Sequence, residues 1–87
     1  MADLYIMNVP EFSVLADAAR RCGAIVTDLG DYLHASSPTR RLAIRREDQV
    51  RPAIWFAALT GGYTGTITRF DADELWLDEY PGSAAVG

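Results

Sequence analysis

The sequence contains no lysine and one cysteine, Cys22, which has no partner in the chain for a disulfide bond. No apolar run reaches the ~18 residues that a membrane-spanning helix needs. The first ten residues also lack the basic start and small-residue cleavage site of a secretory signal. These absences favour a cytoplasmic protein that does not bind membranes.

Positive charge is scarce, with 8 basic residues against 12 acidic ones, a net charge of −4 and a pI near 4.7. Nucleic-acid binding is therefore not expected, because it depends on clustered cations. All the cations are arginines, and six form the adjacent pairs Arg20-Arg21, Arg40-Arg41 and Arg45-Arg46. These pairs are either solvated ends of structural elements or forked contacts to carboxylates of a partner protein.

The composition itself is that of a globular protein, since 49% of the 87 residues are hydrophobic. A chain of this size buries only about 60–65% of the surface that its unfolded form exposes, so its core is thin. We expect one domain over residues 1–80. The tail, residues 81–87, has the composition of a disordered end.

The first half predicts a strand, a helix and three more strands. The strand Leu4–Asn8 is followed by a helix that begins near Pro10 and ends before Gly23. Its apolar stripe makes Cys22 a small core residue rather than a nucleophile, and comprises Val14, Leu15, Ala18, Ala19 and Cys22. The extended segments that follow are Ala24–Asp28, Asp31–Ser36 and Arg41–Arg46, and in the last of these Leu42 and Ile44 should face the core.

The second half predicts a short helix and a hairpin. The helix starts at Pro52 and runs for about nine residues to Gly61. The hairpin joins Gly65–Phe70 to Glu74–Glu79, with Leu75 and Leu77 in the core and Trp76 on the other face. The predicted fold is therefore α+β, in the order β-α-β-β-β-α-β-β, with two helices packed on a mainly antiparallel sheet.

Familiar catalytic and ligand motifs are not matched. A phosphate loop needs a lysine and opens a helix, whereas Gly61-Gly62 follows one and fits a helix terminator. On a strand His34 and Asp31 point to opposite faces, so they cannot share a metal, and His34 is expected to be exposed. The acidic turn 71–74 lacks the glycine and distal glutamate of a calcium loop. The serines lie in no nucleophile elbow. We therefore expect no catalytic residue, metal site or cofactor.

The second helix is apolar over more than half of its circumference. Its large aromatic residues, Trp55 and Phe56, are either anchors for a partner protein or core residues beneath the final hairpin. The small residues after the helix favour close approach of a partner backbone, and these are Gly61, Gly62 and Gly65.

Taken together, these segments resemble the effector, or coupling, proteins of bacterial multicomponent di-iron monooxygenases, such as component B of soluble methane monooxygenase and its relatives in phenol, toluene, propane and alkene oxidation. The resemblance spans residues 4–80 approximately. It rests on segments found in the family's order: Val26–Tyr32, Arg41–Arg46, Arg51-Pro52, Thr60–Thr64, Gly65-Thr66-Ile67 and Asp71–Glu79.

The resemblance implies a cofactorless protein, monomeric when free, that binds the di-iron hydroxylase and controls oxygen and substrate access. It also implies a role in oxidising aromatic or alkene hydrocarbons. The family's small-residue cluster, which contacts the hydroxylase, corresponds to Thr60, Gly61, Gly62, Tyr63 and Thr64. Arg51, Trp55 and Phe56 are further contacts suggested by their expected exposure. A Gly62→Trp change should weaken hydroxylase activation and leave the fold intact.

Two other interpretations remain open. One is a small cofactor-independent monooxygenase or isomerase of the dimeric ferredoxin-like type, with His34, Trp55 or Tyr63 converging on a pocket. The other is a ligand-sensing regulatory domain, whose melting temperature would rise with a small metabolite.

Overall fold

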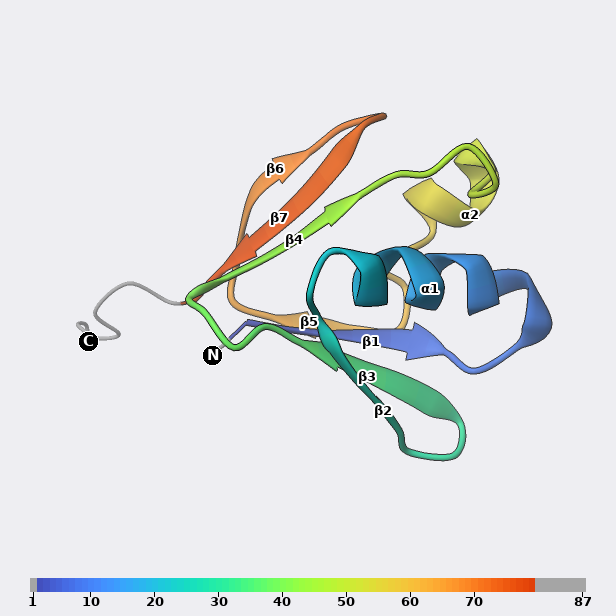
Figure 1. The fold of residues 1–87 in the computed structure, drawn as a ribbon, viewed down its shortest axis with the longest axis horizontal. Helices are drawn as coiled ribbons and strands as arrows, with labels where there is room; N and C mark the ends of the chain where they lie inside the picture. The colour runs from blue at the N-terminus through green and yellow to red at the C-terminus, as the bar shows by residue number, and fades with distance from the viewer. Residues whose placement is uncertain (1, 80–87) are drawn as a thin grey trace.

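Two antiparallel sheets and two helices make up the fold in a computed structural model that describes residues 2–79 (Figure 1). The elements are β1 (Asp3–Met7), the 3₁₀ turn η1 (Pro10–Phe12), α1 (Ser13–Arg21), β2 (Ile25–Asp28), β3 (Tyr32–Ser36), β4 (Arg41–Arg45), α2 (Pro52–Phe56), β5 (Tyr63–Thr64), β6 (Thr66–Phe70) and β7 (Glu74–Asp78). The predicted α+β class is confirmed. The predicted tail 81–87 lies outside the described residues.

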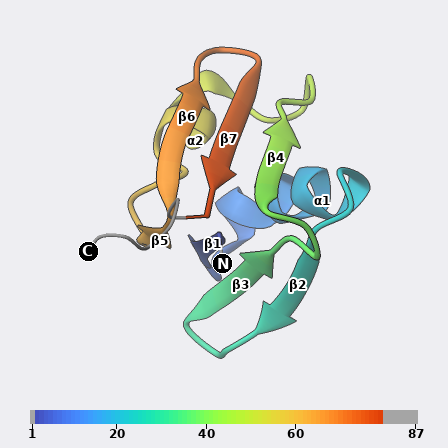
Figure 2. The ribbon, with the colours of Figure 1, turned by 90° about the vertical axis from the view of Figure 1, so that its left-hand side faces the viewer.

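The strands form two separate sheets, as Figure 2 shows from the side, and the chain passes to the second sheet at β4, returns to the first at β5 and re-enters the second at β6. Sheet A has four strands in the order β2-β3-β1-β5, and sheet B has three in the order β4-β7-β6. Every pair of neighbouring strands is antiparallel. The division into two sheets was not predicted, because strand periodicity does not reveal which strands pair.

The core lies between the sheets, with α1 packed above sheet A and beside β4 (Figure 1). Burial alternates along β4 and β7, as expected where a sheet has one buried face. The predicted inward orientation of Leu42, Ile44, Leu75 and Leu77 is confirmed, because all four are buried. Sheet A and α1 contribute Leu4, Ile6, Leu15, Ala18, Ala19 and Ala35.

The second helix is shorter than predicted. The α-helix ends at Phe56, and residues 57–61 form successive turns in which the amide of Ala58 bonds to the carbonyl of Trp55 and that of Thr60 to Ala57. The chain leaves the helix here because it must return to β1, where the carbonyl of Gly62 accepts a hydrogen bond from the amide of Tyr5. None of the helices described between residues 2 and 79 is long and apolar enough to cross a membrane.

The prediction that Cys22 lies in the core is wrong. Helix α1 ends at Arg21, so Cys22 is its C-cap and leaves the apolar stripe. The thiol is exposed, and its Sγ accepts a hydrogen bond of 3.3 Å from the backbone amide of Arg45.

Candidate functional site

The predicted contact segment 60–64 forms a turn followed by strand β5 at the edge of sheet A. β5 pairs with β1, placing Tyr63 opposite Leu4 and Thr64 opposite Asp3. Tyr63 is exposed, and the Thr60 hydroxyl donates to the carbonyl of Ala57 at 2.7 Å. The segment is thus a surface feature anchored to a central strand rather than a free loop.

The sequence favoured close approach of a partner's backbone at the glycines of this region. In the structure, the chain's own backbone approaches two of them. A Cβ at Gly61 would lie 2.1 Å from the carbonyl oxygen of Tyr5, and one at Gly65 would lie 2.5 Å from that of Asp78. Both positions are therefore occupied by the chain's own backbone. Gly62 faces open space, but its φ of +101° is a conformation that L side chains rarely adopt. The expectation that Gly62→Trp leaves the fold intact is therefore not supported, because the substitution strains the backbone.

The two aromatic residues of α2 differ in exposure. Trp55 is 0% exposed, its indole N–H donates to the carbonyl of Asp71, and its ring lies 6.0 Å from that of Phe70. It belongs to the core beneath the final hairpin and is not available as a contact in this conformation. Phe56 is 54% exposed and packs one side on Phe70, with ring centroids 5.7 Å apart.

Arg51 lies in a different environment from residues 60–64. It precedes α2 and lines a cleft of about 410 Å³ together with Pro10, Glu11, Val14, Gln49, Ala53 and Ile54. Its guanidinium makes no hydrogen bond or ion pair with the residues described, so it is free to meet a carboxylate. The cleft includes none of the residues 60–64, and Arg51 would form a separate contact.

A polar network that the sequence analysis missed joins β5 to the middle of sheet A. Asp3 accepts a hydrogen bond from the Thr64 hydroxyl at 2.7 Å, and its other oxygen lies 2.7 Å from Nε2 of His34. Burial opposes ionisation of Asp3, but the hydrogen bonds from Thr64 and His34 outweigh it and lower the pKa of the carboxyl group below its usual value. The network therefore holds a negative charge at the base of the contact segment.

The prediction that His34 is an exposed strand residue is therefore wrong. Its side chain is 25% exposed, and its ring stacks on Tyr5 at a centroid distance of 5.1 Å. Strand alternation could have placed Tyr5 and His34 on outward faces, but only the pairing of β1 with β3 makes them neighbours. Asp3 and Thr64 are 61 residues apart in sequence, and no local signal connects them.

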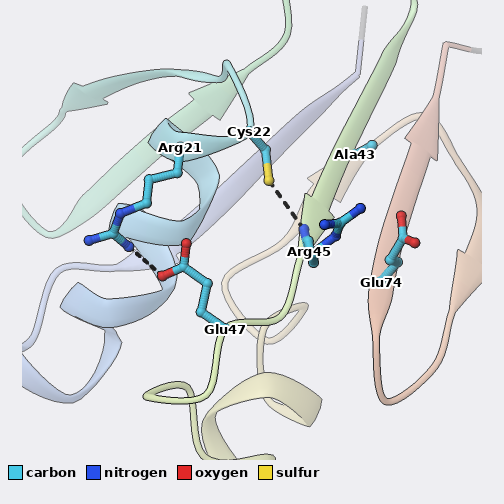
Figure 3. Close-up of a pocket in the computed structure, with 6 residues that line it drawn as sticks. All are labelled: Arg21, Cys22, Ala43, Arg45, Glu47 and Glu74. Carbon is cyan, nitrogen blue, oxygen red and sulfur yellow. Dashed lines mark hydrogen bonds and ion pairs between the residues drawn. The ribbon is translucent and has the colours of Figure 1, made fainter.

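A second cleft, of about 460 Å³, lies between the end of α1 and sheet B (Figure 3). Arg21 forms an ion pair with Glu47 across it, while Arg45 and Glu74 line the side formed by the sheet. Two cations and two anions line this cleft, so their charges balance and favour neither an anionic nor a cationic ligand.

Among residues 2–79, no group of three or more histidine, cysteine, aspartate or glutamate side chains is placed to hold a metal ion. Comparison of the chain with protein-family models, curated proteins and solved structures gave no match. The sequence resemblance and the geometry of this surface are therefore the grounds for a functional proposal.

Proposed function

We propose that this chain is a cofactorless effector that binds the hydroxylase of a multicomponent di-iron monooxygenase and controls oxygen and substrate access and catalytic coupling. The observation that carries the proposal is the anchored segment 60–64, in which Thr60 and Tyr63 are exposed, together with the exposed Phe56 on the preceding helix. Aromatic side chains on a rigid support are the residues that contribute most at protein interfaces.

Such a role requires no catalytic residue on the effector. A protein that binds one conformation of its partner more tightly shifts the population towards that conformation. A coupling free energy of about 1–3 kcal/mol changes affinities or populations by some 5- to 150-fold. The hydrogen bonds of Asp3 and Tyr5 to the segment 60–64 favour this mechanism, because a pre-ordered surface loses little conformational entropy on binding.

The direct test measures product formation by a di-iron hydroxylase encoded beside this chain, with and without the purified protein. We expect wild-type protein to bind the hydroxylase and raise product formed per electron supplied. Tyr63→Ala and Phe56→Ala should each weaken binding by about tenfold or more, the range of interface hot spots. Asp73→Ala, an exposed change in the β6–β7 turn that lies outside the segment and outside the cleft lined by Arg51, is the control and should behave as wild type. A wild-type protein that neither binds nor changes turnover would refute the proposal.

Two observations weigh against the enzymatic alternative. A ferredoxin-like domain follows a β-α-β-β-α-β order, whereas residues 2–79 form seven strands divided between two sheets. The residues suggested for its pocket are also separated, because Trp55 is buried in the core and neither cleft described above is lined by His34, Trp55 or Tyr63.

A further inference from the structure

Most of the exposed large hydrophobic residues among positions 2–79 belong to sheet A or lie next to its strands. Five of the six belong to the strands of sheet A or to segments next to them, the sixth is Phe56 of α2, and none lies on sheet B. The five are Val9, Ile25, Leu29, Tyr32 and Tyr63. Large apolar side chains left exposed along one sheet make its surface a candidate interaction site.

The register of sheet A places two of these residues, Ile25 and Tyr32, on the outer face, whereas Tyr63 pairs with Leu4 and lies on the core-facing side of the sheet. Leu4 and Ile6 point into the core, so the alternate residues of β1 and their cross-strand partners point outward. This outer face of sheet A consists of Asp3, Tyr5, Met7, Ile25, Thr27, Tyr32, His34 and Ser36. Among residues 2–79, no helix packs on it, because α1 lies against the opposite, buried face (Figure 1).

The outer face is continuous with the contact segment 60–64. The ring of Tyr32 lies beside Gly61, since its Cε1 would be 3.3 Å from a Cβ at that position. At the other end of β5, the Thr64 hydroxyl bonds to Asp3. The two regions therefore form one surface, and a partner that covers residues 60–64 meets Tyr32 next.

The charges of this surface have one sign. Residues 2–9, 24–36 and 60–64 include no arginine or lysine, and their acidic residues are Asp3, Asp28 and Asp31. Asp28 is held by the Asn8 side chain and the amide of Gly30, whereas the exposed carboxylate of Asp31 makes no hydrogen bond or ion pair with the residues described. A complementary surface would be apolar at its centre and basic opposite the β2–β3 turn.

We propose that the outer face of sheet A is the larger part of the docking surface, and that it binds an apolar patch bordered by arginine or lysine side chains on the hydroxylase. This inference rests on the proposed function, because it takes the hydroxylase as the partner. It extends the docking surface from residues 60–64 to Ile25, Tyr32 and Asp31. It also specifies the chemistry of the partner's surface.

The first experiment introduces a cation at an exposed position on an edge strand of each sheet. Ile25→Arg places a guanidinium on the edge strand β2 of sheet A, and Thr66→Arg places one at an exposed position on the edge strand β6 of sheet B. Titration calorimetry with the hydroxylase should show affinity reduced about tenfold or more for Ile25→Arg and unchanged for Thr66→Arg. Circular dichroism and urea unfolding verify that both variants fold.

The second experiment tests charge complementarity. Asp31→Lys and Asp73→Lys change the net charge equally, but the first lies in the β2–β3 turn of sheet A and the second in the β6–β7 turn of sheet B. Asp31→Lys should weaken binding several-fold at low salt. The difference in affinity from wild type should become smaller at higher salt, because salt screens the charge at position 31 from the basic side chains of the partner. Asp73→Lys should match wild type under the same conditions.

The outcomes separate this inference from the proposed function. If Tyr63→Ala loses binding but Ile25→Arg and Asp31→Lys bind as wild type, the effector role stands and the docking role of sheet A is wrong. If wild-type protein does not bind the hydroxylase, both are wrong. Sedimentation that reveals a dimer disrupted by Ile25→Arg would place a second copy on this face and also overturn the inference.

Discussion

The outward-facing side chains of the two sheets differ in how many contacts they make with other side chains of the same chain. On sheet B, the ring of Trp76 lies beneath the guanidinium groups of Arg41 and Arg69, at 4.3 and 5.3 Å from the ring centroid. The same arginines bond to the carboxylates of Asp78, Asp71 and Glu74. The indole N–H of Trp76 also donates to Glu74.

Sheet A shows the opposite arrangement. Its polar groups gather around Asp3, while Ile25 and Tyr32 remain exposed to solvent with no covering element among residues 2–79. On sheet B, the cation–π contacts and cross-strand ion pairs already occupy the charged and aromatic side chains, so a partner would add few new interactions there. Sheet A leaves apolar area from which water can still be displaced. This difference is why we propose docking on the outer face of sheet A and not on sheet B.

The largest effect is expected at Gly61, where the contact segment joins sheet A. Gly61→Ala would place a Cβ against the Tyr5 carbonyl, so we expect it to destabilise the fold by about 3 kcal/mol, the upper end of the usual cost of overpacking. Urea unfolding monitored by circular dichroism measures the change. Gly23→Ala is the comparison, because its cost comes from a positive φ alone, with no atom within 4 Å of the added Cβ, and should be about 1–2 kcal/mol. A loss well below about 1 kcal/mol for Gly61→Ala would show that the contact with Tyr5 is not a constraint.

A smaller effect is expected at Asp3, the buried acid of sheet A. Asp3→Ala removes the partner of both Thr64 and His34 and should cost about 1–3 kcal/mol. Asp78→Ala on sheet B breaks a more exposed ion pair and should cost less than about 1 kcal/mol. Amide hydrogen exchange of residues 62–64 should increase in the first variant alone. Unchanged exchange there would show that Asp3 does not hold β5 in place.

The smallest effect concerns acid stability at the tip of sheet B. The hydrogen bond from Arg69, with those from the amides of Glu74 and Asp73, lowers the pKa of Asp71 from 3.8 to about 2. A depressed pKa contributes stability above the unfolded value, and that contribution is lost as pH falls from 3.8 towards 2. Unfolding midpoints of Asp71→Asn should therefore vary less with pH in this window than those of wild type. Parallel curves would show that the Asp71 contacts do not form in solution.

Local sequence patterns predicted most of the elements but not their assembly. Alternation in RLAIR and ELWLD identified Leu42, Ile44, Leu75 and Leu77 correctly, because each sheet has one buried face. The end of α2 was misplaced because tertiary contacts, not propensity, turn the chain towards β1. The network of Asp3, His34 and Thr64 was missed for a related reason, since it joins three strands that are distant in sequence.

The packing of Gly61 and Gly65 affects how related sequences should be interpreted once they are aligned. Any chain with this backbone must keep glycine at both positions, because the carbonyl groups of Tyr5 and Asp78 leave no room for a side chain. Invariance there would follow from the architecture alone and would persist in descendants that had changed partners. Evolutionary constraint from the partner should instead be sought at Ile25, Tyr32 and Tyr63, where the fold itself imposes little restriction.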